Sequence, residues 1–217
     1  MRSILLRLEE DRQKIKILNR LVSFYGFQHW WEDENRISDW VSIILIQQTT
    51  EMNAKKALDR LHNHLSVTKL MQLDELVLQD LIRPAGFFKQ KSKYIKELID
   101  WFHSYGSDLS AFHHYSTEEI RKELLSIRGV GPETADVMLL YIFERKVFIA
   151  DQYAIRLFNR LGMGNYKSYE DMQKSFNHLV KDIPYDLCKE WHAAIDTHGK
   201  AYNKNKEMDE SWLLSNL

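Results

Sequence analysis

The stretch LLSIRGVGPETADVMLLYIFERKVFIAD, residues 124–151, decides how this chain is interpreted. It holds a glycine–hydrophobic–glycine turn at Gly129–Gly131, and Pro132 follows directly. Proline is favoured as the first residue of a helix, because the N–H group that it lacks is not needed there. The stretch therefore predicts two helices joined by a tight turn, with Asp151 opening the helix that comes next.

The composition of the whole chain is typical of a helical protein. Its 217 residues are 44% hydrophobic, and they include only eight glycines and three prolines. Apolar residues recur with helical spacing along most of the sequence and rarely alternate with polar ones. We therefore expect an all-α protein of one or two domains.

Charge, cysteine content and hydropathy limit the class of protein. The formal net charge of −1 argues against a protein that coats a polyanion, but not against one that grips a short stretch of backbone. Cys188 is the single cysteine, which excludes an internal disulfide and a multi-cysteine metal centre. No apolar run approaches the ~20 residues of a membrane span, and residues 1–16 do not resemble a signal peptide. We expect a cytoplasmic monomer without membrane contact, associated with the nucleoid if the source is bacterial.

Local signals predict where helices begin and end. Ser116 and Glu119 have the spacing of a capping box and open a helix that runs to about residue 126. Ser38 is expected to cap a buried helix, and Gly162 and Gly199 are expected to end the helices that precede them. The other predicted helices cover, approximately, residues 1–25, 39–48, 54–65, 74–83, 88–103, 132–142, 152–161, 168–181 and 186–197.

The turn at Gly129–Gly131 suits a phosphate group. Glycine permits positive φ angles and the close approach of another backbone. The first N–H groups of the helix that follows carry partial positive charge. An ordinary tight connection between helices is the alternative, because helical hairpins often contain glycine.

Four further motifs accompany the turn. The hairpin reads IRGVGPETA over residues 127–135, and Asp151 follows it at a fixed distance. The segments 47–50 (QQTT), 86–91 (GFFKQK) and 198–200 (HGK) complete the pattern. Together these motifs resemble the helix-hairpin-helix DNA glycosylases of the endonuclease III superfamily, and the resemblance covers nearly the whole chain.

The resemblance implies a DNA glycosylase of base excision repair that acts on damaged double-stranded DNA. It implies that Asp151 is the catalytic carboxylate, which stabilises an oxocarbenium-like transition state and orients water. An ordinary helix cap is the alternative role of Asp151, and the two roles are compatible. The implied DNA-binding residues are Gly129, Val130, Gly131, Thr134, Gln48, Phe87, Lys89 and Lys91.

Two loop residues are candidates to fill the gap that a flipped base leaves in the stack. These are Gln48 and Phe87, for which the alternatives are a polar helix end and a core aromatic, respectively. The basic run over residues 83–96 either contacts phosphate beside this loop or forms a solvated face.

The base pocket implied by the resemblance contains Trp30, Trp31 and Lys200. Electron-rich rings attract a cationic alkylated base. Core packing is the alternative for the tryptophans, because neighbours on a helix cannot both point one way. Lys200 either contacts the acidic side of the cleft, ties the terminal helices together, or is chemically modified.

Two departures from the family pattern narrow the expected chemistry. Glu133 stands where bifunctional members carry a nucleophilic lysine, and a carboxylate cannot form the Schiff base that strand cleavage requires. Three of the four cysteines of the family's iron–sulfur cluster have no counterpart, and Asn203 stands near the first position. We therefore expect no cluster, metal or other cofactor, and no AP lyase activity.

These departures, with the sequence around Asp151, most resemble the 3-methyladenine DNA glycosylase branch. We predict a monofunctional glycosylase for alkylated purines. The alternatives are a mismatch uracil/thymine or oxidised-base glycosylase, and a non-catalytic DNA-binding protein that uses only the hairpin. By resemblance, residues 35–145 form a six-helix domain that ends in the hairpin, residues 1–34 and 146–217 form a second domain, and DNA binds in the cleft.

Overall fold

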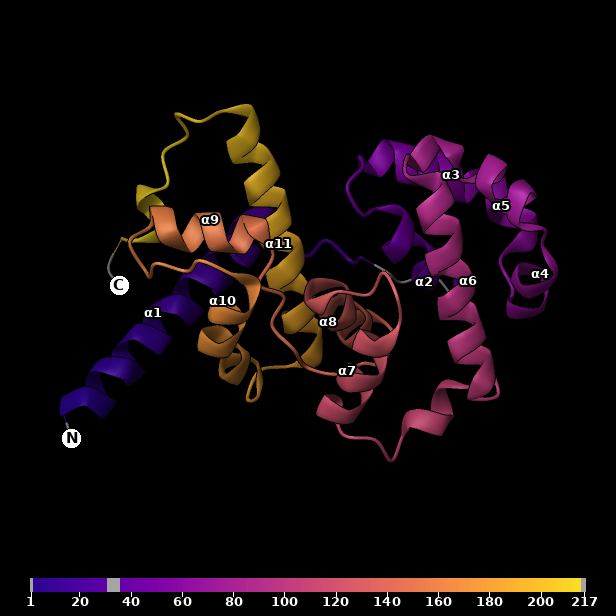
Figure 1. The fold of residues 1–217 in the computed structure, drawn as a ribbon. Helices are drawn as coiled ribbons and strands as arrows, with labels where there is room; N and C mark the ends of the chain where they lie inside the picture. Colours follow the sequence, from indigo (N-terminus) through magenta and orange to yellow (C-terminus); the bar gives the residue numbers. More distant parts are fainter. Residues whose placement is uncertain (1, 31–35, 216–217) are drawn as a thin grey trace. The chain divides into compact units, whose positions relative to one another are not determined.

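The computed structural model describes residues 2–30 and 36–215, and all their regular structure is helical (Figure 1). The described residues divide into two compact units. The first unit is formed by the two ends of the chain, up to Trp30 and from Arg145 onward, and the second by the central segment that ends at Glu144. The predicted all-α class is confirmed. Within the described ranges, no helix has both the length and the apolar character needed to cross a membrane.

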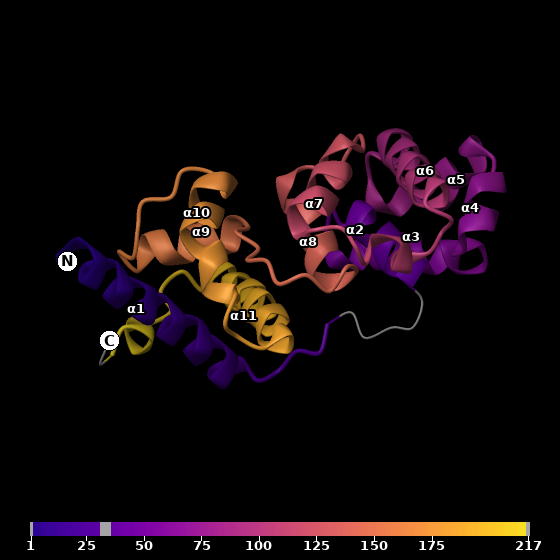
Figure 2. The same ribbon diagram turned by 90° about the horizontal axis from the view of Figure 1, so that it is seen from below.

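The first unit is organised around two long helices, α1 (Arg2–Tyr25) and α11 (Tyr185–Lys204), which lie side by side in both views (Figures 1 and 2). α9 (Gln152–Arg160) packs against α11, and α10 (Tyr169–Phe176) packs against α9. Trp191 of α11 is fully buried, and its indole N–H donates to Asn19 Oδ1 of α1 at 2.9 Å. Burial of large side chains at these contacts stabilises the unit.

The second unit is built around α6 (Phe88–Ser104), which packs against α2 (Arg36–Leu45), α4 (Val67–Gln72) and α5 (Glu75–Leu81). Its core contains an aromatic cluster in which the Trp40 ring lies 4.8 Å from Phe102 and 5.8 Å from Trp101. The other helices of this unit are α3 (Glu51–Leu61), α7 (Thr117–Ser126) and α8 (Pro132–Tyr141), with short 3-10 turns η1 (His62–His64), η2 (Arg83–Ala85) and η3 (Leu109–Phe112).

The capping signals give mixed results. The capping box is confirmed, since Ser116 and Glu119 exchange both bonds at the start of α7. The predicted cap at Ser38 is wrong, because α2 already begins at Arg36. Gly199 does not end a helix either, since it lies inside α11. The short α4 was not predicted, although Ser66 caps it.

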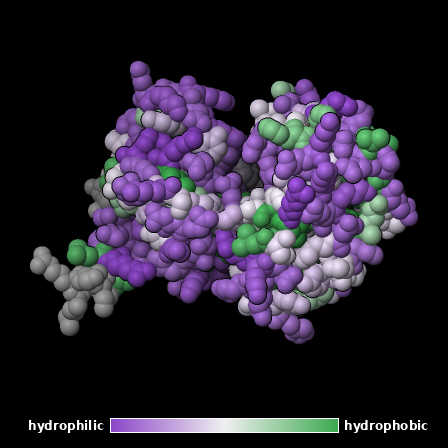
Figure 3. Space-filling model, viewed as in Figure 1, coloured by the Kyte–Doolittle hydropathy of each residue, from purple (hydrophilic) through white to green (hydrophobic). Residues whose placement is uncertain are grey.

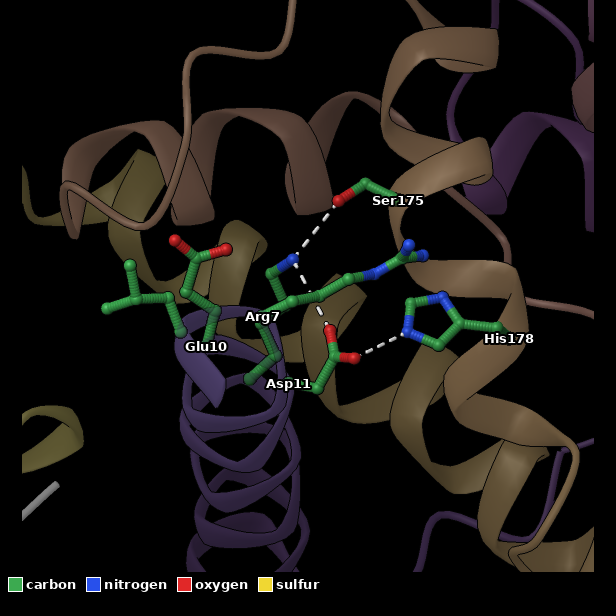
Figure 4. A pocket seen from close by; sticks show the side chains of 7 residues that line it. Arg7, Glu10, Asp11, Ser175 and His178 are labelled. Atoms are coloured by element: carbon green, nitrogen blue, oxygen red, sulfur yellow. Dashed lines mark hydrogen bonds and ion pairs between the residues drawn. The ribbon is translucent and has the colours of Figure 1, made fainter. Parts of the chain in front are cut away.

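A hollow of about 440 Å³ lies between α1 and the segment formed by α10 and η4 (Asn177–Val180). Polar side chains bridge it, since Lys14 donates to Ser175 Oγ at 3.1 Å. Asp11 pairs with His178 at 2.8 Å, as Figure 4 shows. None of the predicted site residues lines this hollow. Its polar contacts hold α1 against α10.

Candidate functional site

The hairpin turn, residues 127–131, joins α7 to α8 with little space to spare. Gly129 has a φ of +89°, and a Cβ atom there would lie 2.2 Å from the Tyr94 ring. Both the backbone conformation and the packing therefore require glycine. Gly131 caps α8 and Pro132 is its first residue, as predicted. The first N–H groups of α8 have no acceptor within the helix, so this end can receive an anion.

A partly buried ion pair joins the two hairpin helices. Arg121 of α7 donates to both carboxylate oxygens of Asp136 in α8, at 2.7 Å and 3.2 Å. The Asp136 side chain is fully buried. A buried carboxylate is costly unless it is paired, so separating α7 from α8 is strongly disfavoured.

The glutamine loop, residues 46–50, is bonded to this hairpin. Gln47 Nε2 donates to the carbonyl oxygen of Gly129 at 3.0 Å and lies 3.3 Å from Thr134 Oγ1. Thr134, a predicted DNA contact, therefore faces the loop with its hydroxyl. Gln48 is exposed and has a φ of +52°, and it lies beyond the end of α2 at Leu45. Gln48 therefore lies in the turn that follows α2, with its side chain exposed.

The phenylalanine loop, residues 82–87, ends in an exposed aromatic ring. Phe87 is 64% exposed and has a φ of +46°, so the alternative of a core aromatic is wrong. An exposed aromatic ring is notable on such a protein, because hydrophilic residues dominate the face of the molecule drawn in Figure 3.

Left-handed backbone at a non-glycine residue is unfavourable and tends to occur at functional sites. Both predicted insertion residues, Gln48 and Phe87, share this feature.

The basic run beside this loop is only partly available to a ligand. Lys91 is 2% exposed, and its Nζ donates to the carbonyl oxygens of Leu45 and Ala85 at 2.7 Å and 2.8 Å. The prediction that Lys91 contacts DNA is therefore wrong, because the ammonium is buried and already bonded. Lys96 likewise donates to carbonyl oxygens at the end of α4. Lys89 is exposed and remains a candidate phosphate contact.

Asp151 lies in the first unit, at the start of α9. Its Oδ1 accepts the N–H of Ala154 at 2.8 Å, so the residue is the helix cap. The residue is 8% exposed, and its Oδ2 lies 3.9 Å from His192 Nε2. The cap fixes the orientation of the carboxylate while its second oxygen faces His192.

His192, on α11, was not singled out from the sequence. Burial, with Lys200 as a second cause, lowers the pKa of His192 to about 4, so the imidazole is neutral at pH 7. Trp30 meets the ring edge-on, with centroids 5.8 Å apart. The residues His192, Asp196 and Lys200 are spaced i, i+4 and i+8, a pattern that predicts a shared helix face.

The structure places two of the three predicted pocket residues, Trp30 and Lys200, near His192. Lys200 Nζ lies 5.7 Å from the centre of the Trp30 ring and 2.8 Å from Asp196 Oδ2. Trp31, the other predicted pocket residue, lies outside the described residues. Asp151, His192, Trp30 and Lys200 form what we call the Asp151 cluster, and all four belong to the first unit.

Glu190 fixes the segment that leads to Trp30. Its buried carboxylate accepts the N–H groups of Gln28 at 2.6 Å and His29 at 3.1 Å. Backbone N–H groups bonded to a charged acceptor form some of the stronger hydrogen bonds in proteins. This segment is therefore attached to α11 two residues before His192.

The HGK motif at residues 198–200 holds the first unit together. A Cβ atom at Gly199 would lie 2.2 Å from the Tyr153 ring, so glycine allows α9 and α11 to approach. His198 is fully buried and bridges Tyr25 Oη (3.0 Å) and Glu210 Oε1 (2.8 Å). His198 therefore ties Tyr25 of the N-terminal segment to Glu210 of the C-terminal segment.

Comparison with known proteins decides the family. The sequence profile of the HhH-GPD superfamily of base excision DNA repair proteins matches residues 41–182. The chain belongs to this superfamily. A protein of Methanocaldococcus jannaschii, whose name describes a DNA repair glycosylase, is 39% identical over 200 residues, which cover 89% of this chain and 90% of the relative. Endonuclease III of Sulfolobus acidocaldarius is 28% identical to this HhH-GPD protein, over a region that covers 77% of this chain and 74% of the endonuclease.

Solved structures show the same HhH-GPD fold. The 3-methyladenine DNA glycosylase of H. pylori, bound to 1,N6-ethenoadenine, superposes with a TM-score of 0.73 at 22% identity, covering 89% of this chain and 98% of its own. A trapped endonuclease III–DNA covalent intermediate superposes with a TM-score of 0.72 at 19% identity, and the match covers 92% of this chain and 90% of the endonuclease chain. At such identities these likenesses establish the fold of this HhH-GPD protein.

Proposed function

We propose that this protein is a monofunctional DNA glycosylase, which hydrolyses the N-glycosidic bond of an alkylated purine of the 3-methyladenine type in double-stranded DNA. The observation that carries the proposal is the Asp151 carboxylate, held by the N–H of Ala154 and set 3.9 Å from His192. In this proposal the hairpin turn of the second unit contacts the phosphate backbone of the DNA. The Asp151 cluster of the first unit hydrolyses the N-glycosidic bond.

In the proposed reaction, Asp151 stabilises the positive charge that develops on the sugar as the base departs. Glycosidic bonds break through oxocarbenium-like transition states, which a nearby carboxylate stabilises electrostatically. The same carboxylate orients the water that completes hydrolysis. His192 is neutral at pH 7 and therefore adds no positive charge that would oppose this cation.

An alkylated purine suits a site in which Asp151 is the proposed catalytic carboxylate. Such a base is already cationic, so it departs without a strong general acid. Trp30 presents an aromatic ring in the Asp151 cluster, and aromatic rings attract cations. A 3-methyladenine DNA glycosylase is among the structures that share the fold, which agrees with this choice of substrate.

The absence of strand cleavage is inferred from Glu133. This residue is exposed in the first turn of α8, at the hairpin position where bifunctional relatives place a lysine. A carboxylate cannot form a Schiff base with the sugar, so the proposed product is an intact abasic site.

A panel of lesion duplexes tests the proposal. Duplexes that carry ethenoadenine, hypoxanthine, uracil or thymine opposite guanine, 8-oxoguanine or thymine glycol are incubated with the protein, alongside methylated DNA. Alkali is then added to half of each sample. We expect cleavage of the alkylpurine substrates after alkali only. Preference for uracil, thymine or an oxidised base would support the alternative glycosylase classes, and nicking without alkali would contradict the role inferred from Glu133.

A further inference from the structure

A buried lysine lies at the base of both loops that carry the proposed insertion residues. Lys91 of α6 is 2% exposed, and its Nζ donates to the carbonyl oxygen of Leu45, the last residue of α2, at 2.7 Å. It also donates to the carbonyl oxygen of Ala85 in η2 at 2.8 Å. Leu45 directly precedes the glutamine loop, and Ala85 is two residues from Phe87. One ammonium group therefore joins the two loops.

The chemistry of this contact favours a charged lysine. The last carbonyl groups of a helix lack partners within it and carry partial negative charge, so they attract a cation. Burial lowers the pKa of Lys91 to about 8, which leaves most of the group protonated at neutral pH. A neutral side chain of similar length would fill the space but leave two buried carbonyl oxygens without this donor.

The same scaffold continues to the hairpin turn. Gln47, at the start of the glutamine loop, donates to the carbonyl oxygen of Gly129. Lys91 and Gln47 thus connect the phenylalanine loop, the glutamine loop and the hairpin turn through side-chain bonds to backbone carbonyls. All three elements belong to the second unit.

We propose that Lys91 is a positioning residue, which holds the glutamine and phenylalanine loops in the geometry that lets Gln48 and Phe87 enter the duplex around a flipped nucleotide. This inference rests on the proposed glycosylase function. Gln48 and Phe87 are exposed and both have left-handed backbone, so their own packing does little to fix them. Bonds at the base of each loop must therefore supply the rigidity.

The role predicts a defect that depends on the opposite strand. Insertion residues offset the cost of separating and unstacking a paired base, a cost that is smallest when the base is already unpaired. Loss of Lys91 should therefore slow excision of a stably paired lesion far more than excision of a lesion opposite an abasic-site analogue. A general loss of folding would slow both reactions equally.

The experiment compares Lys91→Met with Lys96→Met. Lys96 is a matched control, since it lies on the same helix and donates to the carbonyl oxygens of Leu70, Met71 and Leu73 at the end of α4. Single-turnover base release is measured on two duplexes that contain the lesion wild type excises fastest, either normally paired or opposite a tetrahydrofuran residue. Thermal melts accompany both variants.

We expect Lys91→Met to slow release from the paired duplex about 100-fold and from the unpaired lesion no more than about threefold, since pairing and stacking are worth a few kcal/mol. Lys96→Met should leave the ratio of the two rates as in wild type. An unchanged ratio in Lys91→Met, or an equal change in Lys96→Met, would overturn the inference. If Lys91→Met melts below the assay temperature, Lys91→Gln is held to the same ratio.

The wild-type protein separates failure of this inference from failure of the proposed function. A wild type that releases no base from any lesion duplex refutes the glycosylase proposal itself. An active wild type whose rate ratio is unchanged in the Lys91 variants refutes only the positioning role.

Discussion

Replacement of Asp151 by asparagine separates the structural role of this residue from its proposed catalytic role. The carboxylate Oδ1 accepts the N–H of Ala154 at 2.8 Å, and an asparagine oxygen accepts the same bond. Asparagine and aspartate are similarly good helix caps, so the stability of α9 should change little. The substitution removes the negative charge and leaves the shape.

The expected loss follows from the position of that charge. A carboxylate about 4 Å from a developing cation contributes about 4 kcal/mol at an effective dielectric constant near 20. Such a loss lowers the rate of base release about 10³-fold. Single-turnover release from an alkylated duplex measures this rate, and fluorescence anisotropy with the same duplex should show unchanged binding.

Asp151→Ala provides the contrast, because it removes both charge and cap. It should lose base release as Asp151→Asn does, and should also lose about 1 kcal/mol of stability. In a protein of this size that loss lowers Tm by about 2–4 °C. An Asp151→Asn variant with the wild-type rate would refute the catalytic role, and one as unstable as Asp151→Ala would refute the separation of roles.

Three further predictions concern the hairpin and the Asp151 cluster. Gly129→Ala should cost at least about 2 kcal/mol of stability, because its φ is +89° and the Tyr94 ring blocks a Cβ. A Cβ at Gly131 would have no atom within 4 Å, so Gly131→Ala should keep the wild-type Tm. That variant should weaken DNA binding about tenfold or more, because the added methyl group crowds the phosphate. Urea unfolding and anisotropy measure the pair, and the reverse ranking would contradict the turn geometry. Glu133→Lys should gain a borohydride-trappable link to abasic DNA that wild type lacks, and an untrappable variant would show that the lysine position alone is insufficient. The pKa of His192 is lowered from 6.5 to about 4, so the unfolded chain binds the proton first as the pH falls, and folding stability is lost between these two values. Between pH 7 and pH 5, the free energy of unfolding of wild type should fall by about 2 kcal/mol more than that of His192→Gln. Equal losses would contradict a buried neutral imidazole.

Signals confined to a few neighbouring residues were reliable guides to the fold. The capping box at Ser116, the proline after Gly131 and the stop at Gly162 all depend on local backbone geometry, and the structure confirms them. Gly199 looks like a helix stop in the sequence, but a contact with another helix explains why glycine stands there. It lies inside α11 because the Tyr153 ring needs the space, and sequence spacing does not reveal that contact.

Charged side chains were the least predictable part of the candidate site. Lys89 and Lys91 look equivalent in the sequence, yet one is exposed and the other is buried and bonded to carbonyl oxygens of Leu45 and Ala85. Those partners come from other elements of the fold, so composition and spacing cannot distinguish the two lysines. His192 was missed for a related reason, because its proximity to Asp151 depends on how α9 packs against α11.

The exposure of Gln48 and Phe87 could not be decided from the sequence alone. Each had a structural alternative. The exposed ring of Phe87 rules out a core aromatic there, whereas Gln48 lies exposed in the turn that follows α2. Their entry into DNA stays a prediction. What the sequence resemblance contributed was the choice of these two positions from among many polar and aromatic residues.

Mass analysis of the products from one methylated duplex tests the central claim most directly. Hydrolysis at the proposed Asp151 site should yield free alkylpurine together with a full-length strand that carries an intact abasic site. Asp151→Asn should yield neither product in the same time. A strand shortened by β-elimination, or a wild-type reaction that releases no alkylpurine, would contradict the claim that this protein is a monofunctional alkylpurine DNA glycosylase.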